Sequence, residues 1–88
     1  MLNLTKLEFV ALEISGNNYL TWILDAEIHL NAKDFGNTIK EGNETSWQDR
    51  SKAMVFLRHY LHEGLRSEYI GVKDPAILWK NLEEMYDQ

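Results

Sequence analysis

The chain has 88 residues, of which 44% are hydrophobic, 26% charged and 11% aromatic, and its formal net charge is −5. This length supports one hydrophobic core, so we expect a single domain over residues 1–88. The absence of cysteine excludes disulfides, cysteine zinc sites and thiolate catalysis. With no apolar run of membrane-spanning length and no secretory signal at Met1, we expect a cytoplasmic protein.

An apolar arm begins the chain. Residues 1–15 mix Leu, Phe, Val and Ile without a clean period, which fits an extended arm or a short helix, and we favour the extended arm. A turn is predicted next, because Gly16 can take a positive φ. Asn17 or Asn18 can then cap the helix that follows.

The first helix is predicted from Tyr19 to Lys33, ending near Gly36. Its apolar residues fall on two stripes about 100° or more apart. The first stripe consists of Tyr19, Trp22, Ile23, Ala26 and Leu30. The second consists of Leu20, Leu24 and Ile28. A helix with two apolar stripes must pack against two separate partners, one for each stripe.

Two partners can cover the second stripe. The arm can fold back so that Phe9, Leu12 and Ile14 cover Leu20 and Leu24. Alternatively, a second protein chain can cover an otherwise exposed apolar patch, and both arrangements can hold together. Our candidate self-association surface comprises Phe9, Leu12, Leu20, Leu24, Ile28 and Phe56.

A polar loop is predicted over residues 37–44. The second helix should then start after Thr45 or Ser46, either of which can cap it, and continue to about Glu63. Gly64 bends or breaks this helix. A short third helix is expected over residues 65–70, ended by Gly71.

The fourth helix is predicted to start at Pro75, with Asp74 as its cap, and its apolar residues share one face. Together the helical stripes predict a core that includes all three tryptophans. The predicted core residues are Tyr19, Trp22, Ile23, Leu30, Trp47, Leu57, Leu61, Leu78, Trp79, Leu82 and Tyr86.

No constellation in the chain favours catalysis or metal binding. His59 and His62 lie one helical turn apart beside Glu63, but a zinc site needs three or four ligands, so we interpret them as a solvated polar face. Glu83 and Glu84 point about 100° apart on a helix, which is unsuitable for paired acid–base chemistry. We therefore expect no enzyme activity and no cofactor.

Two motifs near the ends of the chain resemble a known family. Residues 14–22 read apolar-x-Gly-x-Asn-Tyr-x-x-Trp, followed by Leu30, and residues 74–86 read Asp-Pro-Ala-Ile-Leu-Trp-Lys-Asn-Leu-Glu-Glu-Met-Tyr. In their order and wide separation, they resemble the N-terminal capsid region of the Gag polyprotein of copia-type LTR retrotransposons. The resemblance covers nearly the whole chain.

This resemblance implies an all-α domain of four to five helices that assembles particles through protein contacts, with itself or another Gag-like chain as partner. The chain would be a fragment of a longer Gag, a truncated element or a cellular sequence derived from one. Direct nucleic-acid binding is not expected, because the nine basic residues are scattered among fourteen acidic ones. The alternative is a host-encoded module that binds a peptide or helix in an apolar groove.

Overall fold

The computed structural model describes residues 9–87, and over this range the chain forms four α-helices and one 3₁₀ helix. In chain order they are α1 (Tyr19–Ala32), η2 (Gly36–Ile39), α2 (Trp47–His59), α3 (Glu63–Glu68) and α4 (Pro75–Tyr86). The predicted all-α class is confirmed. The first eight residues of the predicted arm lie outside the described residues.

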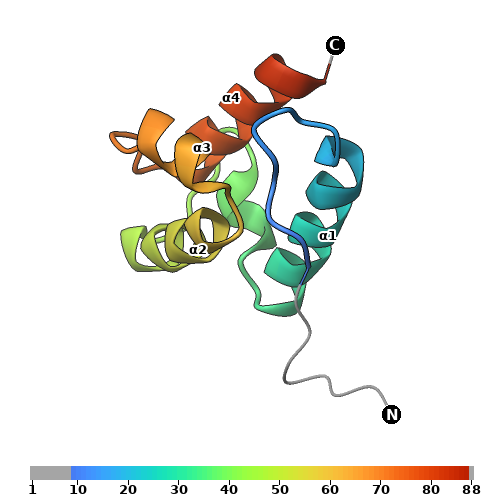
Figure 1. Ribbon diagram of the computed structural model, residues 1–88. Coiled ribbons are helices and arrows are strands. Elements are labelled where there is room, and N and C mark those ends of the chain that lie inside the picture. The colour runs from blue at the N-terminus through green and yellow to red at the C-terminus, as the bar shows by residue number, and fades with distance from the viewer. Residues whose placement is uncertain (1–8, 88) are drawn as a thin grey trace.

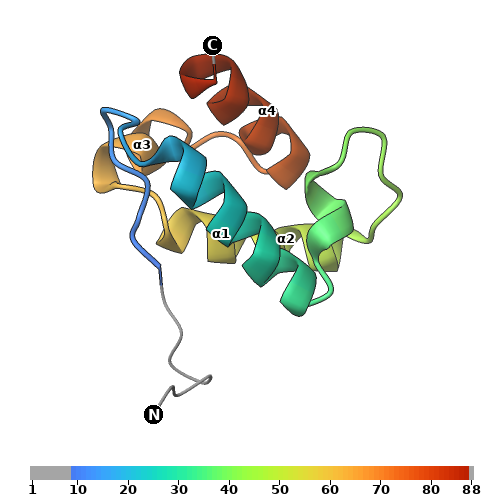
Figure 2. The ribbon, with the colours of Figure 1, turned by 90° about the vertical axis from the view of Figure 1, so that its right-hand side faces the viewer.

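The described part of the arm, in blue, passes between α1 on one side and α2 and α3 on the other (Figure 1). A quarter turn brings α1 to the front, with α2 behind it and α4 above (Figure 2). The 3₁₀ helix η2 packs against both α1 and α4. The arm and all five helices contribute side chains to one hydrophobic core, either buried in it or packed against it.

The described part of the arm is not helical, and it pairs through Leu12 with the segment between α2 and α3. The backbone N–H of Leu12 donates to the carbonyl oxygen of Tyr60 at 2.8 Å, and the N–H of His62 donates to the carbonyl oxygen of Leu12 at 2.9 Å. These bonds form an isolated parallel bridge between Leu12 and Leu61. The arm is thus anchored by a contact between distant parts of the sequence.

The turn before α1 uses Gly16 as predicted, with φ of 76°. A Cβ atom at this position would also collide with the Tyr86 ring. Asn18 occupies the N-cap position but makes no capping bond with its side chain. Its amide instead accepts from the Glu13 N–H at 3.0 Å and donates to the Ala11 carbonyl at 2.9 Å, so it holds the arm.

The first helix ends at Ala32, one residue before the predicted Lys33, and Asp34 then takes a left-handed conformation with φ of 63°. The Phe35 N–H then returns to the Leu30 carbonyl at 2.8 Å and satisfies one of the free carbonyls of the last helical turn. The start of the predicted polar loop is also helical. It forms η2, in which Thr38 and Ile39 are buried.

The second helix starts as predicted, with the Ser46 hydroxyl accepting from the Asp49 N–H at 3.1 Å. It ends at His59 rather than Glu63, because the chain turns to pair with the arm at Leu61. Gly64 therefore does not break α2. It lies in the first turn of α3.

The third helix ends at Glu68, earlier than the predicted Ile70. The fourth helix starts at Pro75 as predicted. Its cap is Asp74, whose carboxylate accepts from the Ala76 N–H at 3.0 Å. Both features stabilise the helix start, because Pro needs no N–H there and the carboxylate satisfies a free donor.

Candidate functional site

Three exposed aliphatic side chains form a row along the outside of α1. Leu20 is 69% exposed, Leu24 is 62% exposed and Ile28 is 63% exposed. They are spaced four residues apart, so they form one continuous ridge on the helix surface. We call these three residues the α1 ridge.

The opposite face of α1 builds the core, as the spacing predicted. Trp22 is 1% exposed, and its indole Nε1 donates to the Tyr60 carbonyl at 2.8 Å. Tyr19, Ala26 and Leu30 are buried beside it, and Ile23 is partly buried. Because this face is fully used by the core, the ridge residues cannot turn inward without displacing Trp22.

The described part of the arm, residues 9–15, leaves the α1 ridge exposed, contrary to the first of our two alternatives. Leu12 is completely buried, so its assignment to the candidate surface is wrong. Its side chain enters the core because the bridge to Leu61 draws the arm towards α2 and α3. Ile14 remains exposed, and Tyr86 fixes the backbone there through a bond from its hydroxyl to the Ile14 carbonyl at 2.7 Å.

Phe9 and Phe56, the other two predicted surface residues, lie together in an aromatic group. The Phe9 ring stacks on Tyr60 with centroids 4.0 Å apart, and Phe56 lies 5.1 Å from the same tyrosine. His29 completes this group, 4.6 Å from Phe9. Both phenylalanines are half-buried, so this aromatic group attaches the arm to α1 and α2 and is not a free surface.

Ten of the eleven predicted core residues are buried or packed against the core, and the exception is Trp47. Its side chain is 61% exposed, so the prediction of a core position is wrong. The first turn of α2 extends beyond the core, and the Trp47 ring is covered on one side by Arg50, whose guanidinium carbon lies 4.7 Å from the ring centroid.

The two family-like motifs meet in the structure. Tyr19 from the first motif lies 5.7 Å from Tyr86 of the second, and Trp22 lies 5.9 Å from Trp79, measured between ring centroids. Gly16 packs against the same Tyr86 ring. The residues that carry the resemblance therefore join α1 to α4, which gives them a structural role in this chain.

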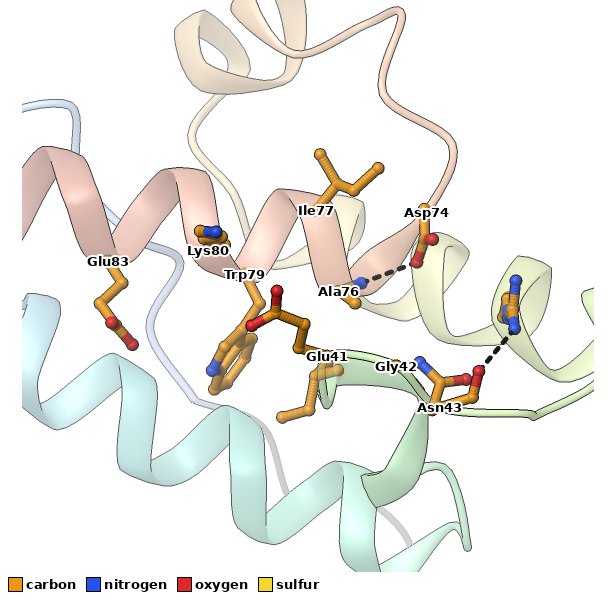
Figure 3. A pocket seen from close by; sticks show the side chains of 11 residues that line it. Glu41, Gly42, Asn43, Asp74, Ala76, Ile77, Trp79, Lys80 and Glu83 are labelled. Atoms are coloured by element: carbon orange, nitrogen blue, oxygen red, sulfur yellow. Dashed lines mark hydrogen bonds between the residues drawn. The ribbon is translucent and has the colours of Figure 1, made fainter.

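A hollow of about 520 Å³ lies between α4 and the loop that precedes α2. Figure 3 shows the Trp79 indole pointing from α4 towards α1, with the Glu41 carboxylate beside it. The residues lining the hollow are Ile39, Glu41, Gly42, Asn43, Arg50, Asp74, Ala76, Ile77, Trp79, Lys80 and Glu83. We did not predict this site. The only available sequence signal was Ile77, an apolar residue outside the core stripe of α4.

Hydrogen bonds hold the loop side of this hollow. The amide of Asn43 donates to the Lys40 carbonyl at 2.8 Å and to the Thr38 carbonyl at 3.2 Å. Arg50 donates to the Asn43 carbonyl at 3.1 Å and to the Thr45 hydroxyl at 3.2 Å. The loop is thus fixed to α2.

The start of α1 lies near two acidic residues at the C-terminal end of α4, Glu83 and Asp87. Burial raises the pKa of Tyr19 to about 12, and the negative charges of Asp87 and Glu83 add to the shift. The pKa of Tyr86 is also raised, by burial first and then by Tyr69 and Glu68. These neighbours disfavour a phenolate, so the tyrosines stay neutral and serve packing.

The three histidines have local contacts. Nδ1 of His29 lies 2.8 Å from the Asp25 carbonyl oxygen, Nδ1 of His62 accepts from the Gly64 N–H at 3.0 Å, and His59 packs edge-on against Tyr60. In the part of the chain that the structure describes, no three side chains of His, Asp or Glu gather as metal ligands would. Within residues 9–87, no helix is long and apolar enough to cross a membrane.

Comparisons of this chain with protein-family models, with curated proteins and with solved structures found no match.

Proposed function

We propose that this chain is a structural module that associates with copies of itself through the α1 ridge. The observation that carries the proposal is the exposure of three large aliphatic side chains in one row. No other helix within residues 9–87 carries three exposed large apolar side chains. Burying such a row on association removes apolar surface from water, which is favourable by about 25 cal/mol per Å².

The resemblance to the capsid region of copia-type Gag supports the same role. A capsid unit is a rigid helical body whose surface contacts repeat around a particle, so each contact can be weak while the assembly is stable. The core residues of the two motifs would supply the rigid body here, and the α1 ridge would supply a contact. The proposal gives the chain no catalytic role.

The test is light scattering on the wild-type chain and on Leu24→Asp over a micromolar to millimolar concentration series. We expect the wild type to associate as concentration rises, and the variant to stay monomeric because a carboxylate in an apolar contact is costly. Leu24 is exposed, so circular dichroism should show an intact fold. Val55→Asp, on the exposed face of α2, is the matched control and should associate like the wild type.

A wild type that remains monomeric at every concentration would refute self-association. Association that persists in Leu24→Asp would refute the α1 ridge as the contact. A Leu24→Asp protein that loses its helices would mean that the ridge is buried within the monomer.

A second candidate function is a binding module for a foreign peptide, and the hollow beside Trp79 favours it. Its lining combines the apolar surfaces of Trp79 and Ile77 with three acidic and two basic side chains, which are Glu41, Asp74, Glu83, Arg50 and Lys80. This chemistry suits a peptide with basic and aliphatic side chains. A monomeric wild type that binds a short Lys–Leu helical peptide saturably, with weaker binding in Ile77→Ala, would favour this function.

A further inference from the structure

We infer that the α1 ridge also binds a helix of a second protein, one whose aliphatic row is flanked by lysine or arginine side chains. Such a partner goes beyond self-association, because its charges differ from those of a second copy of this chain. Its binding depends only on the exposed ridge and on the charged groups beside the ridge.

The ridge has an acidic flank on each side. The helix Tyr19–Ala32 contains Asp25 and Glu27 but no lysine or arginine. At 100° per residue, Glu27 lies about 60° from Leu24 on one side of the helix, and Asp25 lies about 100° away on the other side. Glu27 is exposed and Asp25 is half-buried. A partner helix that covers the ridge therefore meets a carboxylate at both edges.

The nearby lysines leave these two carboxylates unpaired. The Lys33 ammonium lies over the Phe56 ring, 5.8 Å from its centroid. Lys40 lines a hollow of about 230 Å³ together with Glu27. Within residues 9–87, neither lysine makes an ion pair with Asp25 or Glu27. Both carboxylates are thus available to basic groups of a partner.

A second copy of this chain fits the apolar row of the ridge but not its flanks. In a two-fold contact the same surface meets itself, so the carboxylates of one copy approach those of the other. Like charges brought together in a contact are unfavourable. A helix with an aliphatic row and basic flanks buries the same apolar area and replaces this repulsion with attraction. It should therefore bind the ridge more tightly than a second copy does.

The same carboxylates disfavour a membrane or a nucleic acid on the ridge. Helices that lie on anionic membranes carry lysine and arginine beside their apolar face, and α1 has neither. Nucleic-acid phosphates would be repelled for the same reason. A protein helix fits the geometry, because the grooves on its surface accept a row of side chains spaced four residues apart.

The test uses the full chain, at a concentration where light scattering shows a monomer, and three helical peptides. The first peptide has a leucine row flanked by lysines, the second has glutamates in place of the lysines, and the third has alanines in place of the leucines. Amide NMR titrations measure the dissociation constants. The first peptide should bind saturably and shift the signals of Leu20, Leu24 and Ile28. The other two should bind at least about tenfold more weakly.

Three variants separate the apolar contribution from the charge. Leu24→Ala should weaken binding of the lysine peptide on the order of tenfold, because apolar contact is lost. Glu27→Gln should weaken it by about two- to fivefold, as expected for one exposed ion pair, and added salt should reduce this difference. Glu84→Gln removes the same charge from an exposed position on α4, and this matched control should bind like the wild type. All three positions are exposed, so circular dichroism should show intact folds.

Equal binding of the lysine and glutamate peptides would overturn the selection by charge. Unchanged binding in Leu24→Ala, together with weaker binding in Ile77→Ala, would place the peptide in the hollow beside Trp79 instead of on the ridge. A lysine peptide that does not bind at all would refute the partner helix. Each of these results leaves self-association standing, whereas a chain that is monomeric at every concentration refutes self-association and leaves the partner helix standing.

Discussion

The orientation of α1 on the core depends on individual buried side chains, and Trp22 is the clearest example. Its ring is buried against Trp79, and its indole N–H satisfies the Tyr60 carbonyl just after α2 ends. Spacing predicted the burial of this residue. It could not predict the hydrogen bond, because the acceptor belongs to a distant turn.

We predict that Trp22→Ala lowers the free energy of unfolding by about 3–5 kcal/mol, because it removes a large buried ring. Trp47→Ala is the matched control. Its ring is exposed apart from the contact with Arg50, so the loss should be less than about 1 kcal/mol. Chemical denaturation measures both values, and similar losses in the two variants would show that the core assignment is wrong.

A second prediction concerns Tyr19, whose pKa is raised from 10.0 to about 12 by burial and then by Asp87 and Glu83. The unfolded chain ionises this phenol near its ordinary pKa, whereas the folded chain does not. The stabilisation is therefore complete below about pH 10 and is lost as the pH rises through about 12.

The free energy of unfolding should consequently fall less steeply in Tyr19→Phe than in the wild type across this alkaline range. Denaturant titrations at a series of pH values measure the two slopes. Some decline should remain in the variant, because the pKa values of Tyr69 and Tyr86 are raised as well. Equal slopes in the two proteins would contradict the assignment to Tyr19.

Among the elements, α1 and its two faces could be predicted from the sequence, whereas the path of the arm could not. Helical spacing depends only on neighbouring residues, so the core stripe and the ridge could both be derived from it. The position of the arm depends on pairing between Leu12 and Leu61, which are far apart in the sequence. Periodicity contains no information on such a contact.

The same reason explains the misplaced end of α2. The apolar stripe continues through Leu61 and Leu65, which suggested a longer helix. In the structure both residues are buried, but Leu61 enters the core from the bridge and Leu65 from α3. Trp47 shows the opposite error, because it lies on the stripe of α2 but beyond the edge of the core.

The arm should contribute to stability through Leu12. We predict that Leu12→Ala lowers the free energy of unfolding by about 2–5 kcal/mol, because the side chain is fully buried. Val10→Ala, two residues away on the exposed side of the arm, should change it by no more than about 0.5 kcal/mol. A small effect of Leu12→Ala in chemical denaturation would mean that the arm is not anchored in solution.

For the whole molecule, the core and the candidate interface are built from opposite faces of one helix. Trp22 and Leu30 tie α1 to the interior, while Leu24 at the middle of the ridge points outward. An aspartate at Leu24 should therefore abolish association without unfolding the domain. The hollow beside Trp79 could not be predicted from the sequence, because it forms only where α4 meets the loop before α2.

The most direct test of self-association through α1 is a series of amide NMR spectra of the wild-type chain at increasing concentration. Signals of Leu20, Leu24 and Ile28 should shift progressively, because their surroundings change on association. Signals of the exposed face of α2, such as that of Val55, should stay fixed. Spectra that do not change with concentration, or shifts that spare α1, would contradict the proposal.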